Sequence, residues 1–225
     1  MALLYKILKG RLHMDTWIKD CELLDFINVD ICFCINEDFY YGPHDVESIA
    51  ARAQTTPLPS VTNKAPATFN YRSLKAQDNS EKLLAYYREV LRLANNYGRK
   101  KAEIGHYFWL KLYFWRPEKE VTMNFPWYDT LEDMTPVLEK IASDEEGLLF
   151  HDVDEGWEIE IVAKDGFVYA REGDFEKGEY SILHKIPRDR LAIDCHEALV
   201  RTQALIEWLS ECVGEDYWTA TKYPV

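Results

Sequence analysis

The sequence predicts an α+β fold, in which an antiparallel sheet has helices packed on one face. Three features indicate it: segments that alternate apolar and polar residues, short turn signals between them, and long stretches with apolar residues every three or four positions. Successive strands joined by short turns pair antiparallel, and helices then cover the sheet. From residue 104 onward the predicted order of elements is ββαβββα.

The first part of the chain predicts one strand and one short helix. Residues 26–35 are rich in β-branched and aromatic side chains, which favours a strand. Gly42 and Pro43 then indicate a turn. Asp45 is placed to cap a short amphipathic helix after that turn.

The stretch over residues 55–77 holds three prolines among scattered polar residues and predicts a long loop. A loop of that length is unusual within one compact domain, so we expect a mixed N-terminal region over 1–77 and an α+β domain over 78–225. Two alternatives remain open. In the first, residues 69–74 form an edge strand. In the second, the whole chain is one single domain.

The middle of the chain predicts a helix followed by two strands. The helix begins at Ser80 and ends before Gly98, which suits the left-handed position after a helix. The aromatic run at 104–115 alternates along its length and predicts a strand. Residues 121–125 predict its partner.

A second helix is expected over residues 131–142, where apolar side chains recur at helical spacing. Pro136 complicates its start, because proline is best tolerated in the first helical position. The alternative is therefore a helix capped by Thr135, with the preceding residues in a turn.

The C-terminal third predicts a three-stranded meander and a long helix. The strands are expected at 157–163, 167–171 and 180–186. Asp165-Gly166 is a strong hairpin signal between the first two. A long amphipathic helix over 187–214 should then cover the sheet.

Composition limits the class of protein. The 225 residues include five cysteines, and an odd number of thiols without a secretion signal fits a reduced, cytoplasmic protein. The longest apolar run is too short to span a membrane. We therefore expect a cytoplasmic protein with no membrane association.

The densest feature is a block of negative charge over residues 129–160, which has twelve carboxylates and one lysine. The whole chain has a net charge of −13, so the block accounts for most of it. A field of this density favours a cationic partner. Trp127, Tyr128 and Trp157 flank or lie in the block and are candidate anchors, because aromatic side chains often dominate binding energy.

Chemical roles for these carboxylates fit the sequence less well. Residues 152–157 lack the glycine spacing of a calcium loop. Glu158 and Glu160 share one strand face opposite the apolar side, so on an exposed face both would be ordinary solvated acids. The six histidines show no paired ligand spacing, and glycine-rich phosphate loops and nucleophile elbows are absent. The sequence thus predicts no catalytic residues, no metal and no cofactor.

Residues 72–119 have a net positive charge, which admits a nucleic-acid footprint. The overall pI near 4.9 argues against it, so we expect no nucleic-acid partner. Complementarity to the acidic half, within the chain or across a homodimer, explains the basic stretch more simply.

Five short segments in the second half of the chain have a distinctive composition: Phe125-Pro126-Trp127-Tyr128-Asp129, Asp154-Glu155-Gly156-Trp157, Arg171-Glu172-Gly173-Asp174, Pro187-Arg188 and Asp216-Tyr217-Trp218. In these segments the chain resembles, in type, a group of bacterial proteins, the immunity proteins found beside polymorphic toxins. The resemblance implies a non-enzymatic inhibitor that binds a basic toxin domain.

The sequence therefore predicts a non-enzymatic cytoplasmic protein that binds a basic partner through an acidic surface. The alternatives are a metal-assisted hydrolase that uses carboxylates near His151, and a structural protein that associates with itself. The predicted partner-binding residues are Trp127, Tyr128, Asp129, Asp144, Glu145, Glu146, Asp152, Asp154, Glu155, Trp157, Glu158 and Glu160.

Overall fold

A computed structural model describes residues 17–42, 54–61, 70–72, 76–116, 118, 121–125 and 130–220. The chain divides into two compact units. Unit 1 comprises Met1–Val29, Tyr113–Pro126 and Pro136–His196, and unit 2 comprises Asp30–Leu112, Trp127–Thr135 and Glu197–Val225. Four elements contribute residues to both units: β2 (Asn28–Cys34), β6 (Leu110–Arg116), α6 (Leu131–Ala142) and α7 (Arg188–Val213).

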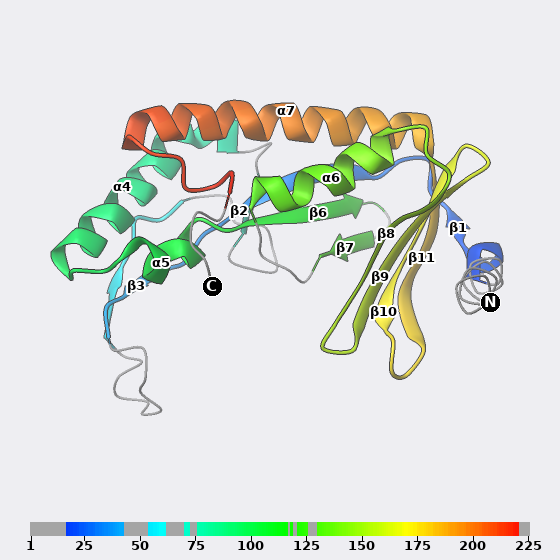
Figure 1. Ribbon diagram of the computed structural model, residues 1–225, viewed down its shortest axis with the longest axis horizontal. Helices are drawn as coiled ribbons and strands as arrows, with labels where there is room; N and C mark the ends of the chain where they lie inside the picture. The colour runs from blue at the N-terminus through cyan, green and yellow to red at the C-terminus, as the bar shows by residue number, and fades with distance from the viewer. Residues whose placement is uncertain are drawn as a thin grey trace, which may run out of the picture. The chain divides into compact units, whose positions relative to one another are not determined.

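Unit 1 contains a five-stranded sheet in the order β1-β11-β10-β9-β8, shown in Figure 1. Its strands are β1 (Glu22–Leu23), β8 (Gly147–Asp154), β9 (Trp157–Lys164), β10 (Phe167–Asp174) and β11 (Glu179–Pro187). β8 to β11 pair antiparallel, and β1 adds to β11 in parallel. A 3₁₀ turn at Ile18–Asp20 precedes β1, and β7 (Val121–Asn124) pairs antiparallel with β6.

One face of the five-stranded sheet is apolar. Ile159, Ile161 and Ala163 alternate along β9 and are buried, as are Val168 and Ala170 on β10. The α6 segment ends beside Arg188, whose Nε donates to the carbonyl of Ile141 at 3.3 Å. A buried guanidinium thereby satisfies carbonyls that the helix itself leaves open.

Unit 2 is built around α4 (Ser80–Asn96). Further elements are β3 (Asp38–Tyr40), β4 (Thr55–Pro57), β5 (Asn70–Arg72), α5 (Lys101–Ile104) and 3₁₀ turns at Gln77–Asn79 and Gly105–Tyr107. β5 pairs antiparallel with β2 in a sheet ordered β5-β2-β6-β7, and β3 pairs with β4. Tyr87 packs between Phe108 and Trp218 in the core, with ring centroids 5.2 and 4.8 Å away.

The α+β class predicted from the sequence is confirmed. The strand at 26–35, the helix from Ser80 and the meander strands are present. Residues 70–72 form the alternative edge strand rather than a loop. The short helix expected after Asp45 lies outside the described residues, and independent folding of 1–77 stays a prediction.

Three expectations need correction. The order from residue 104 has a further strand, β8, which makes it ββαββββα after an initial helical turn. The aromatic strand begins at Leu110, because residues 101–107 are helical and Glu103 accepts the N–H of Lys100 at 2.6 Å. The sheet is also not wholly antiparallel, since β1 joins it in parallel.

The helix at residues 131–142 begins at Leu131, with Pro136 inside it. The alternative start at Thr135 is therefore wrong. The first N–H groups of the helix, from Leu131 and Glu132, donate to the carbonyls of Trp218 and Thr219 at 2.9 Å. Acceptors from the distant C-terminal segment thus complete a helix start that local sequence leaves ambiguous.

Candidate functional site

The acids of the block that lie between α6 and β9 divide between the two ends of β8 in unit 1. Asp144, Glu145 and Glu146 lie in the turn before the strand, and Asp154 and Glu155 lie at its end. Figure 1 shows these two turns at opposite ends of β8. Eight residues of extended chain separate them by roughly 25 Å. The predicted single acidic surface is therefore wrong for these residues, which form two separate groups.

The β8–β9 and β10–β11 turns meet at one end of the sheet, which we call the hairpin tip and define as residues 152–157 and 174–179. Trp157 lies opposite Asp174 in register, and the N–H of Phe175 donates to the carbonyl of Gly156 at 2.7 Å. A Cβ added at Gly156 would lie 3.4 Å from the carboxyl carbon of Glu176. The two turns are thus in direct contact.

The β8–β9 turn depends on left-handed backbone. Glu155 has φ 46° and Gly156 has φ 85°. Two successive positive φ angles are those of a type I′ hairpin turn, which matches the twist of the paired strands. Glutamate is not a favoured residue there, which explains why β8 was not predicted from the sequence.

The hairpin tip combines charge with exposed apolar surface. It has six carboxylates (Asp152, Asp154, Glu155, Asp174, Glu176 and Glu179) and one base, Lys177. Lys177 pairs with Asp174 at 2.6 Å. Val153, Trp157 and Phe175 are 42%, 36% and 52% exposed. Such a surface can attract a cation, because aromatic area and carboxylates both interact favourably with one.

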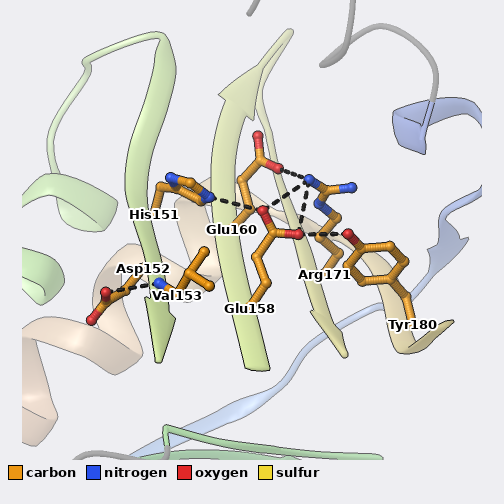
Figure 2. A network of polar contacts seen from close by, with 7 residues as sticks. All are labelled: His151, Asp152, Val153, Glu158, Glu160, Arg171 and Tyr180. Atoms are coloured by element: carbon orange, nitrogen blue, oxygen red, sulfur yellow. Dashed lines mark hydrogen bonds and ion pairs between the residues drawn. The ribbon is translucent and has the colours of Figure 1, made fainter. Parts of the chain in front are cut away.

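Glu158 and Glu160 face the opposite side of the sheet from the apolar core and are buried, at 2% and 7% exposure. Figure 2 shows both carboxylates pointing toward Arg171. The Nη2 atom of Arg171 lies 3.2 Å from Glu158 and 2.6 Å from Glu160. The expectation that these two acids are solvated is therefore wrong, because Arg171 of the neighbouring strand lies directly opposite Glu160.

Two further donors complete the network around Glu158. The hydroxyl of Tyr180 donates to Oε2 at 2.6 Å, and Nε2 of His151 lies 2.8 Å from Oε1. The guanidinium of Arg171 also lies over the rings of Tyr180 and Trp17, at 4.5 and 5.2 Å from their centroids. Two carboxylates share one guanidinium, so the further contacts from Tyr180 and His151 help to offset the cost of burying charge.

The network keeps Glu158 ionised and Tyr180 protonated. Burial alone raises the pKa of Glu158, but the hydrogen bonds from Tyr180 and His151 and the charge of Arg171 outweigh it, so the pKa lies below the ordinary value. Burial and the hydrogen bond to Glu158 raise the pKa of Tyr180 to about 12. A carboxylate with this many donors is poorly suited to release or accept a proton, which favours a structural role.

The structure places the predicted site residues in three groups. Trp127, Tyr128 and Asp129 lie outside the described residues. Asp154, Glu155 and Trp157 come together at the hairpin tip with the half-buried Asp152, whose carboxylate accepts the N–H of Val153 at 2.8 Å. The exposed acids at the other end of β8 are Asp144, Glu145 and Glu146. Glu158 and Glu160 belong to the buried network, so they are removed from the predicted surface.

Sequence reasoning missed Phe175 and Glu176 at the tip and Arg171 and Tyr180 in the network. A turn was expected at residues 173–178, which include Phe175 and Glu176. Alternate hairpin turns of an antiparallel meander lie at the same end of the sheet, so this turn could have been placed beside the β8–β9 turn. Arg171 is an isolated base in an apolar strand, which indicates a paired partner nearby.

The alternative prediction was a metal-assisted hydrolase with a metal near His151, but the structure has an arginine beside the carboxylates there. The guanidinium of Arg171 occupies the position between the two carboxylates that a cation would take. In the part of the chain that the structure describes, no group of three or more histidine, cysteine, aspartate or glutamate side chains is arranged to hold a metal ion. Burial raises the pKa of the Cys34 thiol to about 12, which makes it unreactive.

No helix within the described ranges has both the length and the apolar character that crossing a bilayer requires. Comparison with known proteins found no matching family model, no similar curated protein and no similar solved structure.

Proposed function

We propose that this protein is a non-enzymatic binding protein that engages a basic protein partner through exposed carboxylates of unit 1. The observation that carries the proposal is the charge of residues 136–196, which include sixteen carboxylates and seven bases. This one stretch supplies a net −9 of the total −13. Charge of that density steers association with a cationic surface and orients it.

Most of the bases in this stretch are engaged within the protein. Arg171 and Arg188 are buried, and Arg190 pairs with Asp194 at 3.2 Å. Lys177 pairs with Asp174, and Lys185 lies over the ring of Phe167. The charges that remain to face solvent are therefore mainly negative.

The most concrete form of the proposal is an immunity protein that neutralises a cognate toxin. The resemblance to immunity proteins found beside polymorphic toxins implies this role. The charge also fits it, because toxins that cleave nucleic acid present basic surfaces to phosphate. An acidic inhibitor competes for such a surface and associates quickly.

A growth assay tests the proposal. A toxin domain identified among the neighbouring genes is expressed in bacteria with and without this protein, and the absence of such a gene would itself count against the proposal. We expect growth to be rescued, and we expect calorimetry to give an affinity for the purified domain that weakens as salt is raised. Absence of rescue together with absence of binding at low salt would contradict the proposal.

A further inference from the structure

We propose that the hairpin tip is the part of unit 1 that recognises the partner, and that it does so by binding an arginine side chain between Trp157, Phe175 and the neighbouring carboxylates. The inference rests on the proposed function and narrows it to one end of the sheet. It adds Phe175 and Glu176 to the residues expected to contact the partner.

The tip presents apolar area and unpaired charge together. Trp157 and Phe175 are exposed, and Asp154, Glu155 and Glu176 lie beside them on the same two turns. Among the described residues, no base forms an ion pair with any of these three carboxylates. A guanidinium fits such a surface, because its face packs on an aromatic ring while its edge donates to carboxylates.

The same arrangement already exists inside this unit. Arg171 lies over the rings of Trp17 and Tyr180 and pairs with Glu158 and Glu160. That pairing shows which chemistry stabilises an arginine in this protein. The tip has the same components facing solvent, with the arginine absent from its own sequence.

The tip is also held in shape before any partner arrives. Nε1 of Trp157 donates to the carboxylate of the buried Glu172 at 3.1 Å, which fixes the indole while leaving 36% of the residue exposed. The side chain and the backbone N–H of the β10–β11 turn residue Lys177 both bond to Asp174. Contacts that are ordered in the free protein lose less entropy on binding.

The acidic group at the other end of β8, formed by Asp144, Glu145 and Glu146, is a weaker candidate for binding an arginine of the partner. Glu146 lies 3.8 Å from Arg188, so part of its field is already neutralised. The exposed apolar side chain next to it is Leu148, and no aromatic residue lies in the turn at 143–146. This end of β8 therefore has charge without the ring surface that an arginine would use, and it supplies a matched control.

Fluorescence anisotropy with a defined probe tests the inference directly. The probe is a labelled peptide of alternating arginine and glycine, and the comparison is the same peptide with lysine. We expect Glu155→Asn with Glu176→Gln to weaken binding of the arginine peptide about tenfold. The charge-matched control, Asp144→Asn with Glu145→Gln, should weaken it less than about twofold. Equal weakening by the two pairs would show a diffuse field and overturn the inference.

The contribution of the aromatic surface is separable from charge. Phe175→Ala should weaken the arginine peptide about threefold without changing the salt dependence, because no charge is removed. Ile193→Ala, a residue of α7 that is 51% exposed, is the control for loss of generic apolar area. Unchanged affinity in Phe175→Ala, or equal affinities for the arginine and lysine peptides, would contradict stacking at this site.

The growth assay distinguishes failure of the inference from failure of the proposed function. Rescue that is lost in the Glu155→Asn/Glu176→Gln variant and kept in the control pair supports the inference. Equal rescue by all three proteins overturns the inference and leaves the proposed function standing. Absent rescue by the unaltered protein overturns the proposed function, and with it the assignment of the tip to that partner.

Discussion

Two groups of carboxylates from the same stretch of sequence have opposite environments. Glu158 and Glu160 lie in the first half of β9, where Arg171 contacts both and Tyr180 bonds to Glu158. Glu155 and Asp154 lie one turn earlier, exposed at the hairpin tip. The comparison shows that neighbouring acids of one dense stretch differ in their surroundings. Glu158 and Glu160 pair with an arginine inside the unit, and Asp154 and Glu155 face solvent.

The largest effect should come from removing the base that the buried acids share. Arg171→Met leaves two buried carboxylates without their guanidinium and should destabilise the protein by about 3–5 kcal/mol. Urea denaturation followed by circular dichroism measures it. Lys177→Met, which removes an exposed base from the next turn, is the control and should change stability far less. Similar losses in both variants would remove the distinction between the two groups.

Removing one buried charge should have a smaller effect. Glu158→Gln deprives Arg171, Tyr180 and His151 of a charged acceptor and should cost about 1–3 kcal/mol. The same denaturation measurement applies. An unchanged unfolding free energy in Glu158→Gln would mean that Glu160 alone balances the charge of Arg171.

Acid should weaken the protein through Glu158. Its pKa in the folded state lies below the ordinary 4.5, so the folded state binds fewer protons than the unfolded chain. The resulting stabilisation is fully present above pH of about 4.5 and is lost as the pH falls through the lowered folded pKa. Unfolding free energies measured across this range should fall less steeply in Glu158→Gln. If the unfolding free energy depends on pH equally in Glu158→Gln and in the unaltered protein, the hydrogen-bonded, ionised state of Glu158 is contradicted.

The smallest effect is expected at the tip. Glu155→Asn removes an exposed carboxylate and supplies a residue that tolerates the positive φ of this position. Stability should stay within about 0.5 kcal/mol of the unaltered protein or rise by that amount. Thermal unfolding measures it. A clear destabilisation would mean that Glu155 has an internal partner and is not free to bind.

Much of the fold was predictable because its signals are local. Asp165 and Gly166 indicated a hairpin turn, and both have positive φ in the structure. Gly98, with φ 64°, ends the helix that begins at Ser80. β8 escaped detection because its turn uses Glu155, a residue that rarely adopts the left-handed conformation.

The candidate site was predictable in part. Alternation along β9 correctly placed Glu158 and Glu160 on the face opposite Ile159 and Ile161, because strand side chains alternate regardless of context. It did not reveal whether that face is covered. Trp17, which lies over Arg171, is more than 140 positions from either acid in the sequence.

By itself, then, the sequence determined the α+β class, the positions of the longer helices and of three meander strands, and the excess of negative charge, because these depend on residue type and short-range spacing. The tertiary structure alone decided which carboxylates face solvent. Strand register brings Arg171 onto Glu158 and Glu160, and the contact between two hairpin turns places Phe175 and Glu176 beside Trp157. Burial and pairing of a charge depend on neighbours far away in the chain, and no local pattern encodes them.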